Sequence, residues 1–235
     1  MMHVVEHRAD DPDAPVVVLV HGVFDSMASF DGVVAELAPD HTVVTYDRRG
    51  WGGSRDLRPA LALADHADDL LMVVGERRAT VVGHSYGGVV GLLAATRRPE
   101  LVASLAVFEP TVAWTDWWPD LETMNGQGAE FRDMLREGSE YLPRPTPTER
   151  AANRESLARD LSLVQRQPFA FADVTVPRLV GGSTNTTPWD FQTGARLATI
   201  LDAELVVFEG AGHPAHRTHP QEFADFARRA VALGR

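Results

Sequence analysis

The sequence predicts an α/β fold in which helices cover both faces of a mostly parallel central sheet. Short strand-like runs of aliphatic residues alternate with longer helix-like segments, which is the pattern of such a sheet. Residues 16–20 are all aliphatic, as expected for a strand that is buried on both of its faces. With 235 residues, 44% of them apolar, the chain is long enough for one domain with a sizeable core.

The first predicted elements are two strands and a helix. Residues 4–6 predict a short edge strand, and the aliphatic run 16–20 predicts the buried strand that follows it. Residues 30–37 predict a helix, with Asp31 near its start and Pro39 just beyond its end.

The next segments continue the alternation. Residues 42–46 predict a strand that ends in a polar, glycine-rich loop at 47–54. Residues 61–74 predict a helix that bears three aspartates, and the β-branched run 80–82 predicts the strand after it. Residues 86–97 then predict an apolar helix.

Beyond a strand predicted at 102–108, prolines break the alternation. We therefore predict that residues 110–174 form an inserted helical cap. Two helix-like stretches lie within it, near 129–140 and near 148–165.

The segments after residue 174 return to the alternation. The elements predicted there are a strand at 178–180, a helix at 191–201, a strand at 205–208 and a helix at 220–233. Residues 1–109 and 175–235 are accordingly predicted to form the core, with the cap inserted between them.

Composition and charge exclude several functions. The net charge of −11 argues against binding to nucleic acid or to anionic membranes. All 22 basic residues are arginine, so lysine-based Schiff-base chemistry is excluded, and the absence of cysteine excludes disulfides and thiolate nucleophiles. Residues 1–15 carry charges where a secretory signal needs an apolar stretch, and no run approaches membrane-spanning length. A cytoplasmic protein without a membrane partner is expected.

The segment Gly83-His84-Ser85-Tyr86-Gly87-Gly88 is the most informative motif. It lies between a predicted strand and a predicted helix, where a Gly-x-Ser-x-Gly turn forces its serine into a sharp bend. The flanking glycines remove side chains that would clash in that bend. The motif predicts that Ser85 is a nucleophile, and the alternative is a glycine-rich turn whose serine has no function.

Three further motifs extend this interpretation. They are His21-Gly22 after a strand, the loop Asp47-Arg48-Arg49-Gly50-Trp51-Gly52-Gly53-Ser54, and Gly210-Ala211-Gly212-His213 near the end. Together with the serine motif, they make the chain resemble the α/β-hydrolase superfamily over nearly its whole length. It is most similar to the small-capped serine hydrolase branch, which includes esterases, lactonases, bromoperoxidase-like proteins and carbon–carbon bond hydrolases.

The resemblance implies roles for several residues. His213 matches the general base of the family. Val23, which follows His21-Gly22, and Tyr86, which follows the nucleophile, match the residues whose backbone N–H groups form the oxyanion hole. His21 itself is expected to hold its loop by hydrogen bonds rather than to carry a proton. No cofactor is implied.

A metal site is an alternative interpretation of His213, because His216 and His219 follow it at a spacing of three. Such a cluster needs a regular backbone, and Pro214 and Pro220 interrupt the segment. No metal is therefore expected.

The acid of the triad departs from the family pattern. Most relatives carry Asp after the strand that follows the cap, where this chain has Asn185, 28 residues before His213. An amide cannot stabilise the imidazolium that forms when the histidine takes the serine proton. Glu109 is the best substitute, because it ends the strand expected beside the strand of Ser85, where a minority of the family places the acid. Asp190, or no acid at all, are the alternatives.

Aromatic residues of the predicted cap bear on the substrate. Trp114, Trp117 and Trp118 could line an apolar pocket, and simple packing of the cap onto the sheet is the competing interpretation. The further candidates for pocket lining are Met124, Phe131, Met134 and Tyr141.

These features predict a serine hydrolase that cleaves a carboxylic ester or a lactone through an acyl-enzyme, on a small, largely apolar substrate. A carbon–carbon bond hydrolase, or a non-hydrolytic lyase or cyclase of secondary metabolism, is an alternative, because Asn185 could signal altered chemistry. A ligand-binding protein on a hydrolase scaffold and a pseudoenzyme are two more. The sequence indicates no oligomeric state.

Overall fold

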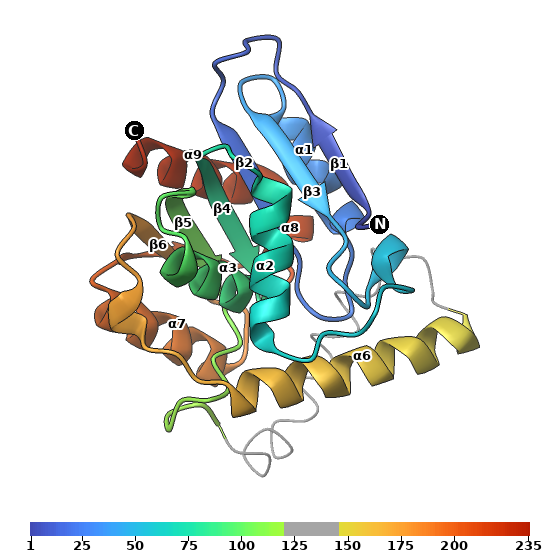
Figure 1. The fold of residues 1–235 in the computed structure, drawn as a ribbon. Helices are drawn as coiled ribbons and strands as arrows, with labels where there is room; N and C mark the ends of the chain where they lie inside the picture. Colours follow the sequence, from blue (N-terminus) through green and yellow to red (C-terminus); the bar gives the residue numbers. More distant parts are fainter. Residues whose placement is uncertain (120–145) are drawn as a thin grey trace.

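A seven-stranded sheet forms the centre of the protein (Figure 1). The computed structural model describes residues 1–119 and 146–235. The strands are β1 Val4–His7, β2 Val16–Val20, β3 Thr42–Tyr46, β4 Ala79–His84, β5 Val102–Phe108, β6 Arg178–Ser183 and β7 Glu204–Phe208. Their order is β1-β3-β2-β4-β5-β6-β7, with β1 antiparallel to β3 and the other pairs parallel. The edge strand and the mostly parallel sheet are therefore confirmed.

Helices cover both faces of this sheet (Figure 1). They are α1 Asp31–Leu37, α2 Leu63–Val74, α3 Tyr86–Arg97, α6 Pro147–Arg166, α7 Pro188–Leu201, α8 Ala215–Thr218 and α9 Pro220–Leu233. The helices α2, α3 and α7 pack on one face, and α1 and α9 pack on the other, which confirms the predicted α/β fold class. In the described parts of the chain, no helix combines the length and the apolar character needed to cross a bilayer.

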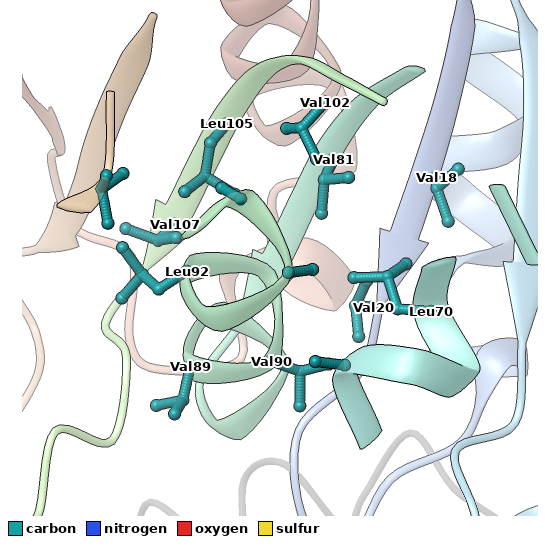
Figure 2. Packing of buried hydrophobic residues seen from close by; sticks show 14 of the residues in the cluster. Val18, Val20, Leu70, Val81, Val89, Val90, Leu92, Val102, Leu105 and Val107 are labelled. Carbon is teal, nitrogen blue, oxygen red and sulfur yellow. The ribbon is translucent and has the colours of Figure 1, made fainter. Parts of the chain in front are cut away.

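Two apolar clusters explain why the strand sequences are continuously apolar. Successive side chains of a strand point to opposite faces, so Val18 and Val20 join the cluster under α2 and α3, whereas Val17 and Leu19 join the cluster under α1 and α9. Figure 2 shows the first cluster, where valines and leucines of β2, β4 and β5 meet those of α2 and α3. Full burial of each such side chain contributes about 1.5–3 kcal/mol.

Two strands extend further than predicted, and both lead into the candidate site. The strand β4 continues through Gly83 to His84, and β6 continues through two glycines to Ser183. Because glycine has a low strand propensity, the ends predicted from the sequence for both strands are too early. Pairing with neighbouring strands outweighs that propensity, since His84 pairs with Phe108 and Ser183 pairs with Phe208.

The strand order places a topological switch point at β2. The next strand along the chain, β3, lies on one side of β2, and β4 lies on the other. The loops that leave the carboxyl ends of β2 and β4 therefore diverge, and ligands of open α/β sheets bind at such a point. The helix α6 runs along this edge of the sheet (Figure 1).

The predicted cap is described in part. The helix expected near 148–165 is α6, and Thr146 caps its N-terminus. The Thr146 hydroxyl accepts from the Glu149 N–H at 3.2 Å, and the Glu149 carboxylate accepts from the Thr146 N–H at 2.7 Å. The helix expected near 129–140 lies outside the described residues, as do Met124, Phe131, Met134 and Tyr141.

Candidate active site

Ser85 occupies a strained turn between β4 and α3. Its φ of 54° and ψ of −124° are unfavourable for a residue with a side chain. The turn also requires glycine two residues later, because a Cβ on Gly87 would lie 2.1 Å from the carbonyl oxygen of Val20. The sharp bend expected from the motif is thus present, and backbone strain of this kind is concentrated at functional sites.

The Ser85 hydroxyl lies beside Thr111. Ser85 Oγ is 3.3 Å from Thr111 Oγ1, and within the described residues it makes no hydrogen bond to His213. Gly22, two residues after β2, is also close, because a Cβ on Gly22 would lie 2.9 Å from Ser85 Cβ. The loop after β2 therefore packs directly against the serine.

His213 is paired with Glu109 although 104 positions separate them. His213 Nδ1 lies 2.6 Å from Glu109 Oε2. Because an ionised carboxylate only accepts, Nδ1 carries the proton, and Nε2 is left for another partner. Burial acts to lower the pKa of His213, but the hydrogen bond and the charge of Glu109 outweigh burial and leave that pKa raised. A buried carboxylate thus holds the imidazole in one orientation.

Glu109 is buried and fully hydrogen-bonded. Its side chain is 0% exposed. Its Oε1 accepts from the Ser183 N–H at 2.9 Å and from the Ser183 hydroxyl at 2.5 Å, while Thr186 Oγ1 lies 3.4 Å from Oε2. The φ of Glu109 is 42°, so this residue too is held in a strained backbone conformation. The strand β6, after which the acid was expected by resemblance, instead supplies donors to Glu109.

Asn185 lies outside this network. It is exposed, and its backbone N–H donates to the carbonyl oxygen of Ala211 at 2.8 Å. This contact ties the loop after β6 to the loop that carries His213. Asn185 stands where most relatives carry the acid, and in this chain the carboxylate beside the His213 imidazole is that of Glu109.

Asp190 is a second carboxylate beside the pair. Atoms of Asp190, Glu109 and His213 lie within 4.8 Å of one another. The Asp190 carboxylate accepts from the Thr187 hydroxyl at 2.7 Å. Burial raises the pKa of Asp190 to about 7, and the charge of Glu109 acts in the same direction. Among the described contacts, His213 is hydrogen-bonded to Glu109 and not to Asp190.

Further histidines pack around the loop of His213. His84 Nε2 donates to the carbonyl oxygen of His213 at 2.8 Å. Burial lowers the pKa of His84 well below its ordinary value, so the ring donates in its neutral form. The ring centres of His84 and His216 are 4.1 Å apart, and His216 Nε2 lies 3.2 Å from Asp25 Oδ2. These contacts hold the His213 loop against the end of β4.

Two groups within the described ranges bring three possible metal-ligating atoms within 4.8 Å of one another. They are Asp25, His84 and His216, and Glu109, Asp190 and His213. In the first group, the guanidinium of Arg217 already pairs with Asp25 and would repel a cation. The second group is the pair described above with its neighbouring carboxylate. Among the described residues, His213, His216 and His219 do not form a metal-ligating group together. His219 Nδ1 lies instead 2.8 Å from Thr218 Oγ1.

Two backbone N–H groups at the switch point are candidates for binding an oxyanion. Tyr86 is the first residue of α3, so its N–H has no partner within the helix. Val23 follows β2, and its N–H donates to no backbone carbonyl in the turns and loops of the described residues. Both groups lie on segments that pack against Ser85.

His21 braces the loop that contains Val23. Its Nδ1 donates to the carbonyl oxygen of Gly22 at 2.8 Å, and its Nε2 accepts from the Arg48 N–H at 2.9 Å. Burial lowers the pKa of His21 to about 4, so the ring is neutral at neutral pH. The hydrogen bonds predicted for His21 are present, and its lack of a catalytic role stays a prediction.

The tryptophans of the predicted cap are engaged in packing. The Trp114 ring centre lies 4.7 Å from that of Phe169, and the Trp118 ring centre lies 5.2 Å from that of Trp189. Trp117 packs against the same apolar cluster as Trp114. All three are partly exposed, so a pocket wall built from them stays a prediction.

Three hydroxyl residues of this site, Thr111, Ser183 and Thr186, were not predicted from the sequence. Each lies within two residues of a position that the motifs had singled out, which was the available signal. The contacts of Ser183 and Thr186 with Glu109 depend on the register of β5 against β6, where Phe108 pairs with Gly181, and the contact of Thr111 with Ser85 depends on the register of β4 against β5. That register is a tertiary property.

Comparison with known proteins places the chain in a family. The sequence profile of the alpha/beta hydrolase family matches residues 17–226. The chain belongs to this family. A relative from Stutzerimonas stutzeri (strain A1501), named "Putative carbamate hydrolase RutD", is 36% identical to this alpha/beta hydrolase over an alignment that covers 94% of the chain and 93% of the relative.

Solved structures share the fold of this alpha/beta hydrolase. Est816, described as an N-acyl homoserine lactone degrading enzyme, is similar with a TM-score of 0.77 and 19% identity, covering 97% of this chain and 96% of its own. The enol-lactonase from Burkholderia xenovorans LB400 is similar with a TM-score of 0.72 and 19% identity, covering 98% and 96%. At these identities the likeness concerns the fold, and the reaction has to be argued from the residues of this chain.

Proposed function

We propose that this alpha/beta hydrolase cleaves carboxylic esters or lactones through an acyl-enzyme on Ser85, with His213 as general base and Glu109 as the triad acid. The 2.6 Å hydrogen bond between His213 Nδ1 and Glu109 Oε2, next to the strained serine turn, is the observation that carries the proposal. A nucleophile, a base and a carboxylate that orients the base are the groups that acyl transfer requires.

The reaction proceeds in two halves. Oγ of Ser85 turns from Thr111 toward His213 Nε2, gives up its proton to that nitrogen and attacks the substrate carbonyl carbon. The oxyanion accepts hydrogen bonds from the N–H groups of Val23 and Tyr86. The intermediate collapses and the leaving alcohol takes the proton from His213; in a lactone, that alcohol stays attached to the acyl chain. Water then attacks the acyl-enzyme, with His213 again as base, and releases the acid.

The class of substrate is inferred from the segment between β5 and β6. We assign residues 110–174 to a cap over the site, and Trp114, Trp117 and Trp118 to the apolar wall of a pocket for a small substrate. The full-length relative named for carbamate hydrolysis adds carbamates as a second candidate class. A carbamate presents the same kind of carbonyl carbon to Ser85.

Labelling with a fluorophosphonate tests the nucleophile, because this reagent forms a bond to an activated serine. We expect one label, located by mass spectrometry on the peptide that contains Ser85, and hydrolysis of p-nitrophenyl esters from acetate to octanoate. Heat-denatured protein is the control and should take no label. Native protein that neither labels nor hydrolyses esters, lactones or p-nitrophenyl carbamate would favour a ligand-binding role instead.

Replacing Asp190 with asparagine is expected to move the acid limb of the pH–rate profile to lower pH. Asp190 ionises around pH 7, its negative charge then helps to raise the pKa of His213, and His213 must be neutral to act as base. Asparagine keeps the shape but lacks the charge, so the imidazole loses its proton at lower pH. The measurement is kcat/KM for p-nitrophenyl butyrate between about pH 5 and about pH 9. Asp225→Asn, at an exposed acid of α9, is the matched control, and superimposable wild-type and D190N profiles would contradict the expectation.

Replacing Asp190 with asparagine should also change how the free energy of unfolding depends on pH. The folded-state pKa of Asp190 is raised from 3.8 to about 7, so the folded protein holds this proton more tightly than the unfolded chain does. The stability that Asp190 contributes is therefore fully present below pH 3.8 and is lost as pH rises through about 7. The unfolding free energy of the wild type, measured relative to that of D190N, should fall across this range.

A further inference from the structure

Arg48 is a buried cation that binds the loop after β2. Its residue is 1% exposed. Its Nε donates to the carbonyl oxygen of His21 at 2.9 Å, and one terminal nitrogen donates to the carbonyl oxygen of Gly22 at 3.0 Å. Its backbone N–H donates to the His21 ring at 2.9 Å. One residue thus satisfies two successive carbonyls and the imidazole that braces them.

These contacts orient the N–H of Val23. The carbonyl of Gly22 and the N–H of Val23 belong to one planar peptide group, so a donor that fixes the carbonyl oxygen also fixes the direction of the N–H. His21 Nδ1 is the second donor to the same oxygen, at 2.8 Å. The guanidinium and the imidazole together hold the Val23 N–H in one direction.

The same guanidinium contacts Tyr86, the other residue with a candidate oxyanion donor. The central carbon of the Arg48 guanidinium lies 4.5 Å from the centre of the Tyr86 ring, within the range of a cation–π contact. Arg48 therefore touches both segments that would bind the oxyanion, one through a peptide carbonyl and one through a side chain.

Asp160 of α6 is the counterion of Arg48. Its Oδ2 accepts from both terminal nitrogens of Arg48 at 3.1 Å and from Trp51 Nε1 at 3.0 Å, and its residue is 2% exposed. His66 Nε2 lies 3.2 Å from Oδ1. Burial acts to raise the pKa of Asp160, but the charge of Arg48 and the contacts of His66 and Trp51 lower it to about 2, so the carboxylate is ionised at neutral pH.

We propose that Arg48 is a positioning residue of the oxyanion hole and that Asp160 couples it to the helix α6. The inference rests on the proposed function, because it names what orients the Val23 N–H in that reaction. The buried ion pair connects the helix that runs along the carboxyl edge of the sheet to a backbone donor for the transition state. A change at position 160 should therefore alter transition-state stabilisation more than substrate binding.

Asp160→Asn tests this coupling. We expect kcat for p-nitrophenyl butyrate to fall about 10- to 100-fold with KM changed by less than about 3-fold, since complete loss of one oxyanion donor costs about 10² to 10³ in kcat. Affinity for phenylboronic acid, which forms a tetrahedral adduct on the serine, should fall in parallel with kcat. Asn153→Ala is the matched control on the same helix, because Asn153 accepts from Arg55 at 3.1 Å outside the Arg48 network. It should keep the wild-type kcat.

A second variant separates positioning from stability, because removing one partner of a buried ion pair also destabilises the fold. The double variant Arg48→Met/Asp160→Leu removes both charges, and we expect it to recover part of the Tm that D160N loses, since no charge is left unpaired, without recovering kcat. Recovery of kcat together with Tm, an unchanged kcat in folded D160N, or a rise in KM alone would overturn the positioning role while leaving the serine mechanism intact. Wild-type protein that neither hydrolyses esters nor labels at Ser85 would overturn the proposed function and this inference with it.

Discussion

Replacing Ser85 with alanine is expected to lower kcat for p-nitrophenyl esters on the order of 10⁵- to 10⁶-fold. The substitution removes the attacking oxygen and leaves the base and the backbone donors in place. Alanine is as restricted as serine at a φ of 54°, so the turn and the Tm should be retained. The residual rate would come from the oxyanion hole and from substrate binding.

Two measurements accompany this variant. The initial rate of p-nitrophenol release gives kcat, and the fluorophosphonate label should disappear. Ser162→Ala, at a serine of α6 whose hydroxyl contacts Arg166, is the matched control and should behave as the wild type. Full turnover of any acyl substrate by the Ser85 variant would remove the serine mechanism.

Glu109→Gln is expected to lower kcat by about 10³- to 10⁴-fold. The amide keeps the size of the side chain, and its oxygen can still accept from Ser183. It lacks the charge that stabilises the imidazolium of His213 during proton transfer, and it no longer favours the Nδ1–H form of the ring. KM for the ester should change little, because the carboxylate is buried behind the histidine.

Asn185→Ala is the informative companion to Glu109→Gln. Asn185 stands where most relatives carry the acid, but it is exposed, so its truncation should leave kcat within about 2-fold. An E109Q protein that keeps its kcat within tenfold of the wild type would show that the acid lies elsewhere. The double variant with Asp190→Asn would then reveal whether the neighbouring carboxylate takes over, through a further loss of kcat.

The architecture could be predicted from the sequence because its signals are local. A strand buried on both faces shows as an unbroken aliphatic run, and residues 16–20 are one. Pairing between strands is not local. The strand ends predicted from the glycines of β4 and β6 were therefore too early. The serine turn could be located because its glycines lie within three residues of Ser85, where crowding of Gly87 against β2 and of Gly83 against the start of α3 requires them.

The partners of the candidate catalytic groups could be predicted only in part, because the sequence favoured Glu109 as the acid beside His213 but left Asp190, or no acid at all, as alternatives. Glu109 is hydrogen-bonded to His213, which is 104 positions away in the sequence, and Arg48 is hydrogen-bonded to Asp160, which is 112 positions away. Hydrogen bonds over such separations depend on strand order, on register and on the direction of each loop, and spacing along the chain contains none of these. The α/β architecture and the serine turn could be predicted from local sequence patterns alone. Only the folded chain shows which carboxylate meets the imidazole, because Glu109 is hydrogen-bonded to His213 whereas the neighbouring Asp190 is hydrogen-bonded to Thr187.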